Sequence, residues 1–169
     1  MREAFMECFR AITCLKTEDL DIAAPPGPLI DILTAITAGA PSFNLEADGK
    51  ISFNAPQGFK VKVDLIQVGD GCVKHLFETE PFLGGSVASK ADLLRLRAIT
   101  VVDRGGEGDV LDFLWLWSAM VREGQRLPWL DKEDLDWVVE AAVLCFPVVG
   151  KLALVAILDN NNSAIALQL

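Results

Sequence analysis

Alternating hydrophobic and polar positions predict strands in the first half of the chain. The clearest strand covers Phe59–Ile66, where every second residue is apolar and charged residues fill positions between them. Because successive side chains of a strand point to opposite faces, this strand has one core face and one polar face. Leu20–Ala24 is also expected to be extended. Ser42–Glu46 and Ile51–Asn54 are expected to pair as a hairpin across an Asp-Gly turn.

Apolar positions three and four residues apart predict helices elsewhere. Met1–Thr13 fits a short amphipathic helix, and Leu29–Ala38 fits a second one that begins near Pro28. In the second helix, four apolar side chains are expected to face inward: Leu29, Ile30, Leu33 and Ile36. A short helix is expected over Cys72–Phe77, and a loop or edge strand over Pro81–Val87.

The pattern becomes helical in the second half. Ser89 and Asp131 are suited to begin helices, because their side-chain oxygens can accept a hydrogen bond from the first turn. We expect helices over Lys90–Val102 and Glu107–Arg122, and a third helix that follows Asp131 and ends near Pro147.

Strands followed by helices predict an α+β fold. We expect a single domain over residues 1–169, with an α/β core at 1–88 and a helical part at 89–169. A chain of 169 residues is long enough to bury a stable core without disulfides or structural metals.

Charge and composition narrow the class of protein. Fifteen basic against 24 acidic residues argue against binding to duplex nucleic acid, because phosphate contacts need clustered Lys and Arg. The four cysteines form no C-x-x-C pair, which favours reduced thiols in a cytoplasmic protein. The most apolar segment, Val138–Leu158, is interrupted by Glu140, Pro147 and Lys151, so it predicts buried core and no membrane contact.

Three aspartates are candidates for metal binding. Asp19 and Asp21 are two residues apart in an extended segment and therefore project from one face, and Asp64 lies on the polar face of the clearest strand. A divalent cation relieves the repulsion between adjacent carboxylates, and Mg²⁺ prefers such oxygen ligands. If the two strands are neighbours, three carboxylates meet as a two-metal site requires. Alternatively, Asp64 forms an ordinary surface ion pair with Lys62.

The segments that carry these aspartates resemble a known family. Lys16–Ile22 is similar to the T-x-D-h-D-h signature of minimal nucleotidyltransferases related to abortive-infection toxins, and Val61–Leu65 is similar to their h-D-h strand. The segment Ser89–Ala98, with the later Arg104 and the D-x-x-D motif Asp109–Asp112, resembles the helical segment of that family. Together these likenesses cover more than half of the chain.

The resemblance implies a mixed sheet flanked by helices, and transfer of a nucleotidyl group from a nucleoside triphosphate to an acceptor hydroxyl. It implies that Asp19, Asp21 and Asp64 bind Mg²⁺, and that Asp64 is also catalytic because it helps to deprotonate the acceptor. With Mg²⁺ as the cofactor, the remaining motif positions are expected to contact the triphosphate of the substrate: Lys16, Thr17 and Arg97.

The family also has a Gly-Gly or Gly-Ser turn ahead of its aspartates, and this chain has Glu7–Ala11 there. Two alternatives to the active enzyme therefore stay open. One is a catalytically inactive nucleotidyltransferase-like domain that serves as a binding or oligomerisation module. The other is an enzyme that uses the same cavity for metal-free acid/base chemistry.

We further expect a homodimer. We expect the sheet to lack the first strand of the family, which would leave a sheet edge that proteins normally cover. The apolar segment Val148–Leu158 and the helices that carry tryptophan are expected to supply the buried surface.

Overall fold

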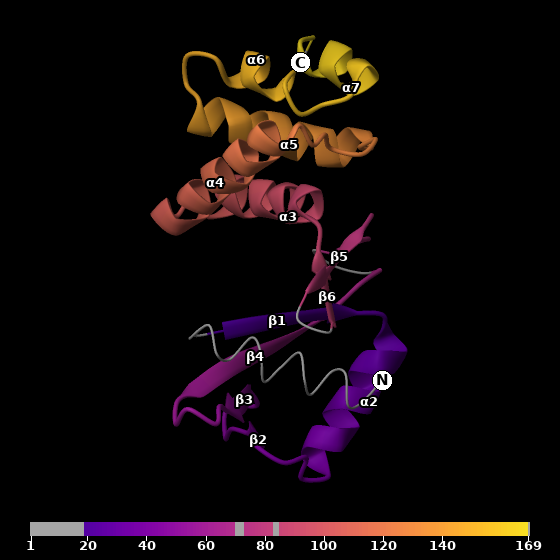
Figure 1. The fold of residues 1–169 in the computed structure, drawn as a ribbon, viewed down its shortest axis with the longest axis vertical. Helices are drawn as coiled ribbons and strands as arrows, with labels where there is room; N and C mark the ends of the chain where they lie inside the picture. Colours follow the sequence, from indigo (N-terminus) through magenta and orange to yellow (C-terminus); the bar gives the residue numbers. More distant parts are fainter. Residues whose placement is uncertain (1–18, 70–72, 83–84, 169) are drawn as a thin grey trace. The chain divides into compact units, whose positions relative to one another are not determined.

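The structure is a computed structural model that describes residues 19–69, 73–82 and 85–168. A mixed four-stranded sheet with a helix is followed by a largely helical C-terminal region, which confirms the α+β class (Figure 1). The chain divides into two compact units, unit 1 over residues 1–87 and unit 2 over residues 88–169. The helix expected over Met1–Thr13 lies outside the described residues.

The sheet of unit 1 has the strand order β1-β4-β3-β2. The strands are β1 (Asp19–Ala24), β2 (Phe43–Leu45), β3 (Ile51–Asn54) and β4 (Lys60–Gln67). β2 and β3 form the expected antiparallel hairpin, and Gly49 has a φ of 82° in its turn, a conformation that glycine adopts without strain. β4 pairs antiparallel with β3 and parallel with β1. All the strands expected here are confirmed.

Helix α2 (Pro26–Thr37) covers the apolar face of this sheet (Figure 1). Ile36 is buried, and Ile32 packs against the same cluster of strand residues. The expected inward face was partly wrong, because Ile30 is 63% exposed and Leu33 is 42% exposed. Residues 32 and 36 lie one turn apart and define the buried stripe, which turns the other two side chains outward.

Two short strands, β5 (Thr79–Phe82) and β6 (Gly85–Ala88), pair with each other after the main sheet. The helix expected over Cys72–Phe77 is wrong for its described part, since residues 73–78 contain no helix. The N–H of Gly69 donates a hydrogen bond to the carbonyl of Val73 at 2.9 Å.

Unit 2 contains three long helices, α3 (Lys90–Asp103), α4 (Glu107–Glu123) and α5 (Lys132–Cys145). The expected helices are confirmed, with small differences at their ends. Ser89 Oγ accepts a hydrogen bond from the N–H of Asp92 at 3.2 Å, and Asp131 Oδ1 accepts one from Asp134 at 2.9 Å. Both expected caps are therefore present.

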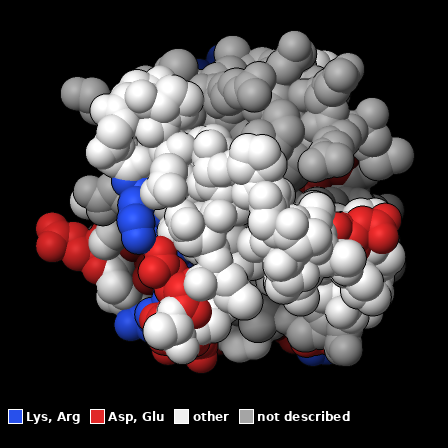
Figure 2. Space-filling model, turned by 90° about the horizontal axis from the view of Figure 1, so that it is seen from below, with Lys and Arg blue, Asp and Glu red and all other residues white. Residues whose placement is uncertain are grey.

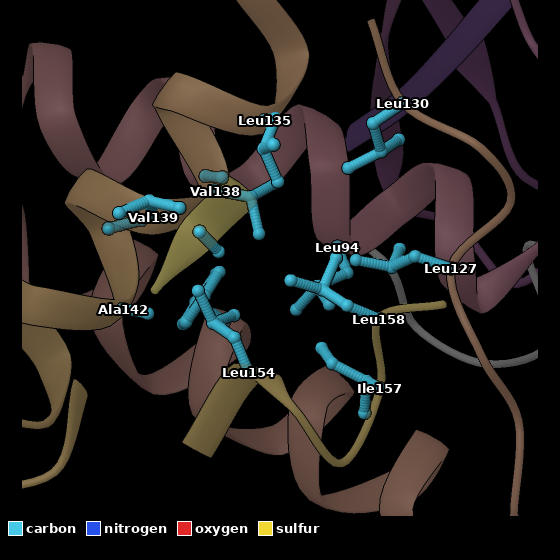
Figure 3. Packing of buried hydrophobic residues seen from close by; sticks show 14 of the residues in the cluster. Leu94, Leu127, Leu130, Leu135, Val138, Val139, Ala142, Leu154, Ile157 and Leu158 are labelled. Atoms are coloured by element: carbon cyan, nitrogen blue, oxygen red, sulfur yellow. The ribbon is translucent and has the colours of Figure 1, made fainter. Parts of the chain in front are cut away.

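Two short helices, α6 (Gly150–Leu154) and α7 (Asn160–Ala166), complete unit 2. Leu154, Ile157 and Leu158 enter its core beside apolar residues of α3 and α5 (Figure 3). Part of the apolar tail is therefore core, as expected for Val138–Leu158. No helix in the described part of the chain is long and apolar enough to cross a membrane.

Candidate metal and nucleotide site

The three aspartates lie on two paired strands of unit 1. The parallel register places Asp21 opposite Asp64, and Asp19 opposite Lys62. Opposite residues on paired strands point to the same face, and alternate residues of one strand do so as well. The intervening apolar residues of both strands belong to the core on the other face. The expected adjacency of the two strands is confirmed, and the three aspartates share the outer face of the sheet.

The carboxyl groups on this face do not converge on one point. Among the residues that the structure describes, no three Asp, Glu, His or Cys side chains form a cluster that could hold a metal ion. Instead, the Lys62 ammonium forms an ion pair with the Asp64 carboxylate. The close approach of three carboxylates that we expected is therefore not seen, and the alternative surface ion pair is.

Lys62 interacts electrostatically with all three aspartates. The hydrogen bond that Lys62 donates to Asp64 raises the pKa of the Lys62 ammonium, and burial opposes this effect. The negative charges of Asp64, Asp19 and Asp21 raise the pKa further. Lys62 therefore supplies a positive charge that all three carboxylates attract. The position of Lys62, two residues before Asp64 on a polar strand face, is the sequence signal for this role.

The polar face continues onto β3 and the β2–β3 turn as a shallow, open depression of about 510 Å³. We name it the lysine depression. Its lining residues are Glu46, Ala47, Asp48, Lys50, Ile51, Ser52, Lys60 and Lys62. Sequence reasoning missed this feature, although the alternation along β4 already puts Lys60, Lys62 and Asp64 on one face.

Ion pairs fill the lysine depression. Glu46 Oε1 accepts hydrogen bonds from Lys60 Nζ at 2.8 Å and from Ser52 Oγ at 2.6 Å, and these bonds lower the pKa of the Glu46 carboxyl. Lys50 Nζ lies 3.0 Å from Asp48 Oδ2, and its hydrogen bond lowers the pKa of Asp48. Figure 2 likewise shows basic and acidic side chains side by side along the margin of one face of the molecule.

Arg97 is part of an ion-pair network between α3 and α4. Its Nη1 lies 2.8 Å from Asp109 Oδ1 and its Nη2 lies 3.1 Å from Asp112 Oδ2, while Arg104 Nη2 lies 3.1 Å from Asp109 Oδ1. Burial would raise the pKa of Asp109, but the hydrogen bond from Arg97 and the charge of Arg104 outweigh burial and lower it. The D-x-x-D motif thus holds the start of α4 against α3.

The other residues expected at the triphosphate, Lys16 and Thr17, lie outside the described residues, as does the segment Glu7–Ala11. Arg97 lies in unit 2, where it contacts two carboxylates. Contact between these three residues and a nucleotide stays a prediction.

Sequence reasoning also missed a buried ionic cluster in unit 2. Arg95 Nη1 donates hydrogen bonds to both carboxylate oxygens of Asp134, at 3.1 and 3.0 Å, and Arg95 Nη2 lies 3.5 Å from Asp92 Oδ1. Ser89 Oγ lies 3.1 Å from Asp92 Oδ2. All four residues are buried. The i,i+3 spacing of Asp92 and Arg95 was the available signal.

No protein family model, curated protein or solved structure matches this chain. The resemblance to nucleotidyltransferases therefore depends on the motifs of the sequence, and the register of β1 and β4 adds the spatial relationship between two of them.

Proposed function

We propose that this protein is a nucleotidyltransferase that moves a nucleotidyl group from a nucleoside triphosphate to an acceptor hydroxyl. The observation that carries the proposal is the parallel pairing of β1 and β4, in which Asp21 of the D-x-D motif lies opposite Asp64 of the h-D-h motif. Asp64 accepts the proton of the acceptor hydroxyl. The acceptor oxygen then bonds to the α-phosphorus, and pyrophosphate leaves.

The donor set suits Mg²⁺, which binds one or two carboxylates together with substrate phosphates. Asp19 and Asp21 would hold the ions with the triphosphate, and Asp64 would ligate the ion nearest the acceptor. Bound Mg²⁺ supplies positive charge that offsets the phosphate oxygens. Lys62 must release Asp64 when a cation binds. Both side chains are about half exposed, at 48% and 42%, and exposed ion pairs of this kind are weak.

A second function is favoured by the same ion pair. Because the Lys62 ammonium already offsets part of the negative charge, the face can persist without a metal ion. The chain also has Glu7–Ala11 where the family has its glycine turn. Both observations fit a catalytically inactive domain that binds a partner or small molecule.

Isothermal titration calorimetry separates these functions. The protein is titrated with each of the four common ribonucleoside triphosphates, once with Mg²⁺ and once with EDTA. The proposed enzyme requires binding that is tighter with Mg²⁺ than with EDTA. Equal binding in EDTA would contradict a metal site and favour metal-free acid/base chemistry, whereas no binding in either buffer would favour the inactive module.

We also propose a cytoplasmic location. In the described part of the chain, Cys145 is a free thiol and half-buried. Burial raises the pKa of the Cys145 thiol, which disfavours the reactive thiolate. A protected thiol of this kind suits a reducing compartment.

A further inference from the structure

The lysine depression brings three ammonium groups to one small area of unit 1. Lys50 belongs to the β2–β3 turn, and Lys60 and Lys62 belong to β4. Ser52 of β3, which lies opposite Lys62 in the register, adds a hydroxyl donor. Three cations and a hydroxyl group within one depression match the needs of a ligand with several anionic oxygens.

The depression adjoins the three aspartates. Lys62 lines the depression and also pairs with Asp64, and it lies opposite Asp19 across the β1–β4 pairing. One face of the sheet therefore carries carboxylates on β1 and β4 beside ammonium groups on β4 and the turn. A metal-bound polyphosphate needs both kinds of group, because its cation requires carboxylate ligands and its phosphate oxygens require hydrogen-bond donors.

The ammonium and hydroxyl donors of the lysine depression contact carboxylates, and phosphate oxygens could replace these carboxylates as acceptors. Glu46 accepts hydrogen bonds from both Lys60 and Ser52, and Asp48 pairs with Lys50. The Lys60–Glu46 pair is largely exposed, with 62% and 39% of the side-chain surfaces accessible, so solvent weakens it. A phosphate oxygen offers the same donors a more highly charged acceptor.

We propose that the lysine depression binds the polyphosphate chain of the nucleotide and replaces the glycine turn of the family. This proposal deepens the proposed function and rests on it for the identity of the nucleotide. The ligand chemistry is a chain of phosphates, which a nucleoside triphosphate or free inorganic polyphosphate can supply. Glu46 acts as an internal competitor for Lys60 and Ser52.

The first arm of the test uses inorganic tripolyphosphate in EDTA, titrated into the full chain by calorimetry. Lys60→Met is expected to weaken binding about tenfold, since it removes one charge-assisted hydrogen bond. Glu46→Gln is expected to strengthen binding about threefold, since it removes a competing charge. Lys132→Met is the matched control, because Lys132 is an exposed lysine in a 2.8 Å ion pair with Asp136 in unit 2.

The proposal would be overturned if Lys60→Met and Lys132→Met lost the same affinity for tripolyphosphate, or if Glu46→Gln bound tripolyphosphate more weakly than wild type. The Glu46→Gln arm guards against a folding artefact, because a poorly folded variant does not bind more tightly.

The second arm repeats the titrations with Mg²⁺ and ATP. If tripolyphosphate binding depends on Lys60 but neither ATP nor any of the other three ribonucleoside triphosphates shows binding that depends on Mg²⁺, the site takes inorganic polyphosphate and the proposed enzyme fails. If Mg²⁺-dependent ATP binding is undiminished in Lys60→Met, the lysine depression is refuted and the enzyme survives.

Discussion

Asp21 and Asp64 lie directly opposite each other where β1 pairs in parallel with β4. Neighbouring strands are about 4.8 Å apart, and opposite residues on paired strands point to the same face. Lys62, one pair further along the same face, interacts electrostatically with both carboxylates. We propose that a metal ion binds at this pair of aspartates.

The first prediction concerns Asp21→Asn. The substitution should abolish Mg²⁺-dependent nucleotide binding, because it removes one charged ligand. The melting temperature of the metal-free protein should stay the same or rise by up to about 4 °C, because a repulsive charge is lost. Calorimetric titration and differential scanning calorimetry measure the two effects. Asp31→Asn on α2 is the control, since Asp31 is an exposed aspartate outside the arrangement, and binding that fell equally in both variants would count against the site.

The second prediction concerns Lys62→Met. Removing the ammonium leaves Asp19, Asp21 and Asp64 without that positive charge, so the metal-free protein should melt at a lower temperature than wild type. Mg²⁺ alone should bind about three- to tenfold more tightly, because a nearby cation no longer competes with it. The measurement is the shift of the melting temperature with Mg²⁺ concentration. Mg²⁺ stabilisation identical to that of wild type would mean that the ion binds elsewhere.

The strands of unit 1 could be predicted because period-two alternation is a local property. The common face of Asp19 and Asp21 follows from their spacing alone. The spacing of the residues did not show whether Asp64 pairs with Lys62 or binds a metal ion. That outcome depends on which side chains meet in the folded protein. Ile30 faces outward because the position of the sheet determines which side of α2 is buried. The local sequence pattern does not contain that position.

In unit 2, the caps Ser89 and Asp131 helped to predict α3 and α5, whereas α6 and α7 were missed. The tail is apolar with few charged positions, so it shows little periodicity. Asp159 was the available signal for α7, because its Oδ1 accepts a hydrogen bond from the Asn162 N–H at 2.8 Å. The contact of Arg95 with Asp134, 39 positions apart, depends on the packing of α3 against α5 and has no local signature.

The third prediction is the homodimer, which we propose on the apolar surface around α6. Val148 is 94% exposed and Leu152 is 65% exposed, whereas Leu154, Ile157 and Leu158 of the same tail are core. Exposed apolar surface of this kind marks interfaces. Sedimentation velocity should show a monomer–dimer equilibrium that Leu152→Lys shifts towards monomer.

Leu45→Lys is the control for that experiment, since Leu45 is an exposed leucine of unit 1. A wild-type monomer at every concentration would contradict the dimer.

The fourth prediction concerns pH and Asp109. Contacts with Arg97 and Arg104 lower the pKa of Asp109, so its stabilisation is complete above the ordinary value of 3.8 and is lost as pH falls through the lowered value. Asp109→Asn should lower the free energy of unfolding by about 1 kcal/mol at pH 7. The deficit should shrink below about pH 4. Urea titrations at pH 7 and pH 3 measure the difference in unfolding free energy between wild type and Asp109→Asn. A difference that does not change with pH would indicate a packing effect.

The last prediction concerns the buried cluster around Arg95. Arg95→Met would leave the buried carboxylates of Asp92 and Asp134 without the guanidinium, which should cost about 3–5 kcal/mol of unfolding free energy. The double variant Arg95→Met, Asp134→Leu should recover part of that loss, since it also removes one of the two buried carboxylates that the guanidinium contacts.

Tryptophan fluorescence during urea unfolding is the appropriate measurement, because all four tryptophans of the chain lie in unit 2: Trp115, Trp117, Trp129 and Trp137. Lys132→Met is the control, since it breaks an exposed i,i+4 pair that contributes only about 0.3–0.5 kcal/mol. If Arg95→Met were no more destabilising than this control, water would have to reach the two carboxylates, and the cluster would not be the ionic centre that joins α3 to α5.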